Sequence, residues 1–131
     1  MPISFFVQKT DRIRIPVYVY TKGDNVEATH LQNEVPKDIV GEQQVINFMF
    51  SKPSHIDSSN IIRQAQIKLR GSDDTSLDLV AFSDGILKTL LKEWDLKEGD
   101  EVMKVSIVNI NNLVPSIAKA AVAGLLEKVQ L

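Results

Sequence analysis

Few side chains in this sequence have the types and spacing that bind a metal ion. The chain contains the histidines His30 and His55 and no cysteine. Neither histidine belongs to a Glu-x-x-His or His-x-x-x-His pattern, which would place ligands on one helix face. We predict a strand around His30 and a loop around His55, so surface or loop-capping roles are the simpler interpretation. The sequence therefore predicts no metal site.

Three acidic residues stand close enough together to suggest acid–base chemistry. They are Asp73, Asp74 and Asp78, and paired carboxylates can act as general acid and base. Helix capping and solvation explain the same residues more simply, because aspartate is a preferred N-cap residue. The sequence also lacks a glycine-rich phosphate loop, a Gly-x-Ser-x-Gly elbow and a Cys/His pair. We expect no catalytic residues, no cofactor and no enzymatic activity.

The clearest basic group, Arg63, Lys68 and Arg70, lies along one predicted helix. Nucleic-acid binding usually needs a larger basic footprint together with stacking aromatic side chains. The formal net charge of the chain is −2. A solvated helix face is therefore the preferred interpretation, and we predict no nucleic-acid partner.

Length and composition indicate one globular unit, residues 1–131. A chain of 131 residues with 44% hydrophobic and 24% charged residues suits one domain with one core. The start of the sequence does not read as a signal peptide. No apolar run approaches the ~18 residues that span a bilayer. We expect a soluble intracellular protein that does not enter membranes.

Residues 1–56 are predicted to be rich in strands. Apolar and polar residues alternate from Ile13 to Tyr20, and the proline at position 16 places this strand at a sheet edge or at a bulge. A turn at 22–25 leads to a weaker partner strand at 26–31. Residues 44–50 form the clearest strand, and apolar residues on both of its faces predict a central position.

Residues 57–131 are predicted to be helical. The first helix is capped at Asp57 or Ser58 and runs to about residue 70, with Gly71 after its end. A second helix runs from about Thr75 to Trp94. Ser106 caps a short helix, and Pro115 begins the last one. The predicted fold class is α+β, with an N-terminal antiparallel β-sheet followed by a C-terminal bundle of three to four helices.

The last helix carries a broad apolar face, which we consider together with the preceding tryptophan. One interpretation places these residues in the core of the monomer, and the other makes them a groove for a partner or a second subunit. The candidate partner-binding residues are Trp94, Ile117, Ala121, Leu125 and Val129.

Residues from about 45 to 131 contain a series of segments that can be compared with a known family. The series begins with Phe48-Met49-Phe50-Ser51-Lys52-Pro53 and the Ile62-Arg63-Gln64-Ala65 helix. It continues through Leu87-Lys88-Thr89-Leu90-Leu91-Lys92-Glu93-Trp94-Asp95-Leu96 and ends with Asn109-Ile110-Asn111-Asn112-Leu113-Val114-Pro115 and the closing helix. In these segments the chain resembles the tail assembly chaperones of long-tailed bacteriophages.

This resemblance implies a non-enzymatic role in the host cytoplasm. Such chaperones bind the long helical tape-measure protein, whose apolar stripe would otherwise aggregate before tail-tube subunits enclose it. The tape-measure protein is therefore the expected partner. Tail-tube subunits and further copies of the chain are additional candidates. The alternative is a structural virion component, such as a tail or head-completion subunit.

Overall fold

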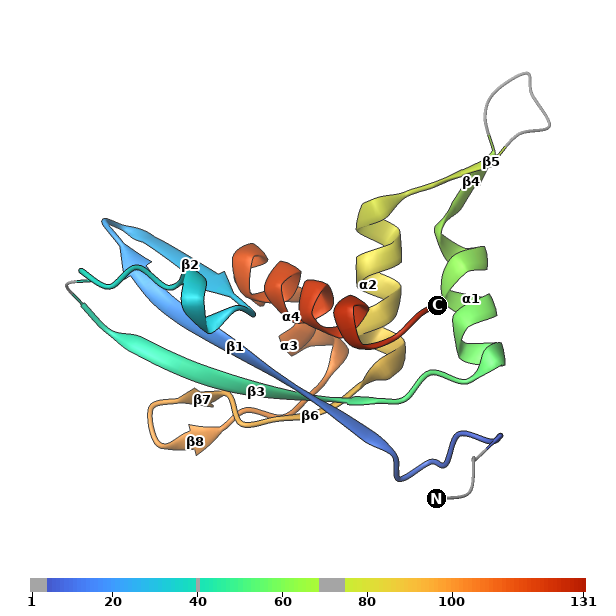
Figure 1. Ribbon diagram of the computed structural model, residues 1–131, viewed down its shortest axis with the longest axis horizontal. Coiled ribbons are helices and arrows are strands. Elements are labelled where there is room, and N and C mark those ends of the chain that lie inside the picture. Colours follow the sequence, from blue (N-terminus) through green and yellow to red (C-terminus); the bar gives the residue numbers. More distant parts are fainter. Residues whose placement is uncertain (1–4, 40, 69–74) are drawn as a thin grey trace.

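An antiparallel sheet is the frame of the molecule, which we describe from a computed structural model covering residues 5–39, 41–68 and 75–131. Its strands are β1 (Arg12–Lys22), β2 (Asn25–Thr29), β3 (Gln43–Ser51) and β6 (Leu91–Trp94), in the spatial order β2-β1-β3-β6. The helices are α1 (His55–Ala65), α2 (Leu79–Leu90), α3 (Ile107–Asn111) and α4 (Pro115–Lys128). Figure 1 shows this arrangement, which confirms the α+β class.

Strand β1 lies between β2 and β3, which corrects the prediction that this strand is at a sheet edge or carries a bulge, although β2 does not extend along it as far as Pro16. Pro16 pairs with Asn47 in an uninterrupted register between β1 and β3. The backbone N–H and C=O of Asn47 both bond to Asp95, so they point away from β1. The Pro16–Asn47 pair is therefore a non-hydrogen-bonded one, and the proline nitrogen faces away from β3. Strand β2 pairs only with residues 18–22, so no ladder bond is lost at the proline.

The hairpin from β1 to β2 forms where the sequence predicts a turn. Lys22 pairs with Asn25, and Gly23 adopts a φ of 63°, a left-handed conformation that glycine takes without strain. Strand β3 is central, as predicted. Its inner face buries Ile46, Phe48 and Phe50, whereas Val45 on the outer face is 46% exposed.

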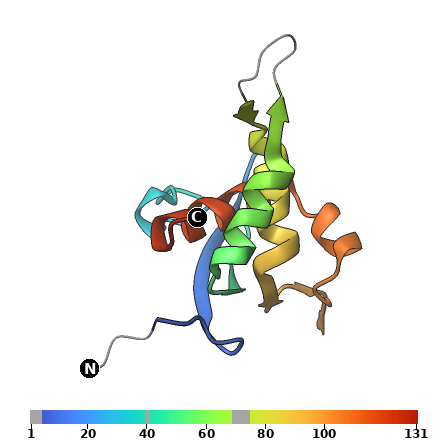
Figure 2. The ribbon, with the colours of Figure 1, turned by 90° about the vertical axis from the view of Figure 1, so that its right-hand side faces the viewer.

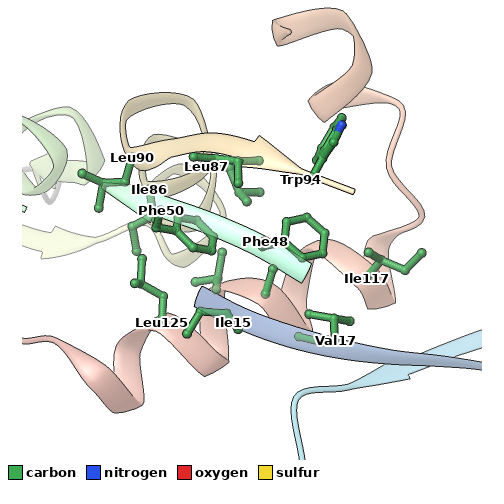
Figure 3. Packing of buried hydrophobic residues seen from close by; sticks show 14 of the residues in the cluster. Ile15, Val17, Phe48, Phe50, Ile86, Leu87, Leu90, Trp94, Ile117 and Leu125 are labelled. Atoms are coloured by element: carbon green, nitrogen blue, oxygen red, sulfur yellow. The ribbon is translucent and has the colours of Figure 1, made fainter. Parts of the chain in front are cut away.

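Helix α4 covers one face of this sheet and contacts β1 and β2. Figure 2 shows α4 next to α1 and α2, and α2 contacts α1, α4 and β6. The core is continuous between these layers, and Figure 3 shows sheet residues such as Phe48 between side chains of α2 and α4. The largest fully buried side chains are Phe48, Phe50, Ile15, Ile61, Ile86, Leu90, Leu125 and Val17.

Helix α1 begins and ends earlier than the sequence predicts. Ser54 is its N-cap: Ser54 Oγ accepts the Asp57 N–H at 3.2 Å, and Asp57 Oδ2 accepts the Ser54 N–H at 3.1 Å. Asp57 thus completes a capping box as the third helical residue instead of acting as the cap. The helix ends at Ala65, after which β4 (Gln66–Lys68) pairs with β5 (Thr75–Leu77). The predicted Gly71 end lies outside the described residues.

Helix α2 is shorter at both ends than predicted. Thr75 belongs to β5, and Asp78 is the N-cap, with Oδ1 accepting the N–H groups of Val80 and Ala81 at 3.0 and 3.1 Å. The helix stops at Leu90 because the chain then pairs with β3 as strand β6.

Trp94 therefore lies on strand β6 and not at a helix end as predicted. Leu91 and Trp94 are three positions apart, so in a regular strand they would face opposite sides of the sheet. The register shifts between Met49 and Phe50 of β3. This irregularity lets both Leu91 and Trp94 turn into the core, where they are 5% and 7% exposed.

The charged segment after Trp94 is a small hairpin. Strands β7 (Lys97–Glu98) and β8 (Glu101–Val102) pair across Gly99, whose φ is 65°. Ser106 then caps α3, and Pro115 begins α4, as predicted. None of the helices within the described ranges combines the length and the hydrophobicity that crossing a bilayer requires.

Candidate functional site

An apolar hollow lies where β6, the β7–β8 hairpin, α3 and the start of α4 meet. We call it the Trp94 hollow, and its volume is about 240 Å³. It is lined by Trp94, Leu96, Glu98, Met103, Asn109, Asn112, Leu113, Val114 and Ile117.

The indole ring of Trp94 is held in place from two sides. It meets the Phe48 ring edge-on, with ring centroids 5.9 Å apart and planes at 88°. Its Nε1–H donates to the Met103 carbonyl at 2.6 Å. Aromatic pairs favour this edge-on geometry, and a buried indole N–H needs an acceptor. The ring is therefore a fixed part of the hollow's lining.

The wall formed by α3 is fixed by capping and by one asparagine. Ser106 Oγ accepts the Asn109 N–H at 3.1 Å, which closes the first turn of α3. The Asn109 side chain donates to the Lys104 carbonyl at 2.6 Å and ties the helix to the segment after the hairpin. Asn112 ends α3 and is exposed, so its amide is available to bond a bound polypeptide.

A second apolar hollow lies on the other side of α3, and we call it the α2 hollow. Its volume is about 360 Å³, and it shares Leu113 with the Trp94 hollow. Leu79 and Val80 at the start of α2 lie at this hollow and are 72% and 80% exposed. The full lining is Leu79, Val80, Ser83, Asp84, Leu87, Ile110, Asn111, Leu113, Pro115, Ala118 and Lys119.

The structure brings together only part of the predicted partner-binding set. Trp94 and Ile117 both line the Trp94 hollow. Ala121 and Leu125 are completely buried in the core, and Val129 is partly buried against it. The apolar face of α4 is thus mostly covered by the sheet, and of the predicted α4 residues Ile117 alone lines the Trp94 hollow.

Sequence reasoning missed Met103, Leu113 and Val114 as lining residues. Leu113 and Val114 stand in the break between α3 and α4, where a leucine and a valine before a proline leave apolar side chains outside regular helices. This break could have identified Leu113 and Val114 from the sequence as apolar residues outside the helices. The sequence has no corresponding signal for Met103. It reaches the hollow because β7 pairs with β8, which brings Met103 beside Leu96, and the Leu96 carbonyl accepts the Met103 N–H at 2.9 Å.

The described residues that were considered for chemistry lie on separate elements of the fold. His55 begins α1 and is exposed, whereas His30 Nε2 lies 2.9 Å from Glu127 Oε1, without hydrogen-bond geometry. Asp78 caps α2, while Asp73 and Asp74 lie outside the described residues. In the described ranges, no group of three or more His, Cys, Asp or Glu side chains is placed to hold a metal ion.

Comparison with protein-family models, with curated proteins and with solved structures gives no match for this chain.

Proposed function

We propose that this chain is a tail assembly chaperone of a long-tailed bacteriophage, which binds and shields the tape-measure protein. It acts without catalysis, in the host cytoplasm, before tail-tube subunits enclose the tape-measure protein. The family resemblance over about residues 45–131 supplies the function. The observation that carries the proposal is the Trp94 hollow, whose lining, apart from Glu98 and Met103, comes from the segments that bear the resemblance.

The size and lining of the Trp94 hollow suit a polypeptide anchor better than a small metabolite. Sites for small molecules usually enclose about 300–1,000 Å³, more than the volume of about 240 Å³ that this hollow has. An amphipathic helix binds a groove through apolar residues spaced three or four apart. One such anchor would rest against Trp94 and Met103, an aromatic ring and a polarisable thioether that favour apolar and aromatic contacts.

Exposed polar side chains, an amide and a carboxylate, give the same surface its polar component. Asn112 and Glu98 lie at the hollow and are exposed. A polar rim around an apolar centre is the usual anatomy of a protein–protein contact. A chaperone that must later be displaced by tail-tube subunits needs a contact of this limited size, because small interfaces dissociate readily.

Binding can be followed through Trp94, the only tryptophan in the chain. Overlapping helical peptides that cover the tape-measure protein encoded by the same phage are titrated into the protein. We expect at least one apolar-striped peptide to shift the emission of Trp94. Glycine-rich peptides of equal length and charge serve as controls.

Val114→Asp is the most informative variant. Val114 lies at the hollow, is 38% exposed and is the N-cap of α4 without a side-chain cap bond. Aspartate is a preferred N-cap, so the fold should be kept or stabilised, while the added charge weakens apolar binding by about tenfold or more. Val26→Asp is the matched control, because Val26 is also 38% exposed but lies on β2.

Two outcomes would overturn the proposal. One is that no tape-measure peptide binds, or that Val114→Asp binds as tightly as the parent chain. The other is that a protein inventory of finished particles contains this chain in stoichiometric amounts. That second result would make the chain a structural virion component, whereas a chaperone is absent from mature particles.

A further inference from the structure

A polar cleft lies where the segment ahead of β1, the end of β3 and the end of α2 meet. We call it the lysine cleft, and its volume is about 480 Å³. Figure 1 shows the segment ahead of β1 close to the connection from β3 to α1. The lining of the cleft is Val7, Gln8, Lys9, Ser51, Lys52, Ser54, Asp57, Thr89 and Lys92. It shares no residue with the lining of the Trp94 hollow or of the α2 hollow.

Three lysines concentrate positive charge at this cleft. Lys9, Lys52 and Lys92 are all exposed, and in the part of the chain that the structure describes none of their ammonium groups forms a salt bridge with a carboxylate. Arg12 adds a further cation beside them, because its guanidinium donates to the Lys9 carbonyl at 2.7 Å. The formal net charge of the whole chain is −2. The lysine cleft is therefore a basic site in a slightly acidic protein, and its like charges repel one another until an anion joins them.

The carboxylates closest in the chain to these lysines hold the backbone of the cleft. Asp57 Oδ2 accepts the Ser54 N–H at 3.1 Å as part of the capping box of α1. Asp11, two residues after Lys9, accepts the Gln8 N–H with its Oδ2 at 3.0 Å. Both carboxylates thus fix the segments that form the cleft instead of pairing with a lysine.

The polar groups that remain at the cleft are mainly hydrogen-bond donors. Lys92 Nζ donates to the Thr89 carbonyl at 3.1 Å, which holds the ammonium group at the cleft while its other hydrogens stay available. Ser54 Oγ accepts the Asp57 N–H, so its own hydroxyl hydrogen can donate to a ligand. Charged donors of this kind make their strongest hydrogen bonds to carboxylate and phosphate oxygens.

The volume of the lysine cleft suits a small molecule. Sites for small molecules usually enclose about 300–1,000 Å³, a range that includes the lysine cleft and excludes the Trp94 hollow. A single phosphate group carries about −1.5 to −2 charges at pH 7, which is less than the charge of three lysines. Two or more phosphate groups in one ligand match these cations better.

We propose that the lysine cleft binds a small molecule that carries two or more phosphate groups, such as a nucleoside diphosphate. The phosphate oxygens accept from the ammonium groups of Lys9, Lys52 and Lys92 and from the Ser54 hydroxyl. The inference does not rest on the proposed function, because the cleft is separate from the Trp94 hollow.

The first test is a titration of the full chain with inorganic pyrophosphate, followed by the NMR signals of the backbone amides. The largest shifts occur at Gln8, Lys52, Ser54 and Lys92, and they saturate. Sodium chloride at equal ionic strength is the control, because screening alone acts on every exposed charge. It leaves the cleft amides no more affected than those of other exposed residues.

Substitution of the lysines tests which groups hold the ligand. Lys52→Gln and Lys92→Gln each weaken pyrophosphate binding by about tenfold, the loss expected for one charge-assisted hydrogen bond. Lys52→Arg keeps the cation and retains binding. Lys22→Gln is the matched control, because Lys22 is also exposed but ends β1, about 30 Å along the strand from the cleft. All four side chains are exposed lysines or replace one, and circular dichroism checks each fold.

Several outcomes would overturn the proposal. One is that sodium chloride reproduces the pyrophosphate shifts, or that the shifts spread over lysines outside the cleft. Another is that Lys52→Gln and Lys92→Gln bind pyrophosphate as tightly as the parent chain. A third is that a single-stranded oligonucleotide or a polyglutamate peptide binds the cleft more tightly than pyrophosphate, because the ligand would then be a macromolecule. These measurements involve neither a tape-measure peptide nor Trp94, so their failure is distinct from that of the proposed function.

Discussion

Gly124 of α4 packs against Ile15 of β1 so closely that a Cβ atom on Gly124 would lie 2.5 Å from Ile15 Cγ2. The same Cβ would be 3.1 Å from His30 Cβ. Ile15 is 2% exposed and β-branched, so its methyl group cannot easily turn aside. The absence of a side chain at Gly124 therefore sets the distance between α4 and the sheet.

We predict that Gly124→Ala destabilises the protein. Overpacking costs about 1–3 kcal/mol, and at a contact this short we expect the cost to exceed the gain of about 1 kcal/mol from replacing glycine in a helix. Urea unfolding monitored by circular dichroism measures the net loss. Gly85→Ala in α2 is the control, because its Cβ would meet Ile61 Cγ2 at an ordinary 3.6 Å. It should stabilise by about 0.5–1 kcal/mol, and equal effects at both sites would refute the packing account.

Trp94→Phe should cost less than Trp94→Ala. Phenylalanine keeps a ring against Phe48 but removes the N–H that bonds the Met103 carbonyl. We expect a loss of about 1–2 kcal/mol, the net worth of a hydrogen bond together with some packing. Alanine should cost about 3–5 kcal/mol. Chemical denaturation followed by circular dichroism compares the two, and an alanine variant as stable as the parent would exclude Trp94 from the core.

Asp95 is predicted to fasten the end of β6 to β3. Its carboxylate accepts the Asn47 backbone N–H at 2.7 Å and the Asn47 side-chain N–H at 2.8 Å. Asp95→Ala should cost about 1 kcal/mol, since the bonds are strong but near solvent. Faster amide exchange of Asn47 gives a local readout. Glu101→Ala, which removes an exposed carboxylate from β8, should change neither stability nor exchange at Asn47.

Ser54→Ala tests where α1 begins. Removing the cap that accepts the Asp57 N–H should destabilise the protein by about 1 kcal/mol. Ser59→Ala, inside the same helix, should be neutral or slightly stabilising because alanine is the better helix former. Thermal unfolding distinguishes the two serines. A stable Ser54→Ala variant would return the start of the helix to Asp57 or Ser58.

The local signals in the sequence determined several elements. Alternation from Ile13 to Tyr20 specified β1, and the glycine turn after Lys22 specified the first hairpin, because strand pairing and positive φ depend on neighbouring residues. Ser106 and Pro115 specified the starts of α3 and α4 for the same reason. These features require no knowledge of distant contacts.

Only the tertiary structure decided the role of Leu91–Trp94. The apolar spacing of these residues continues the helical pattern of α2, yet they complete the sheet beside β3, and a register shift turns Trp94 inward. Pairing with a strand some 45 positions earlier in the chain outweighs local helix propensity.

The location of the candidate site depended on the same long-range contacts. The apolar face of α4, which the sequence predicts as a partner-binding surface, is largely buried against the sheet. Trp94, Met103 and Val114 form one surface because β6, the hairpin and the α3–α4 break converge. Sequence periodicity identifies the apolar residues, whereas packing between distant elements decides which of them stay exposed.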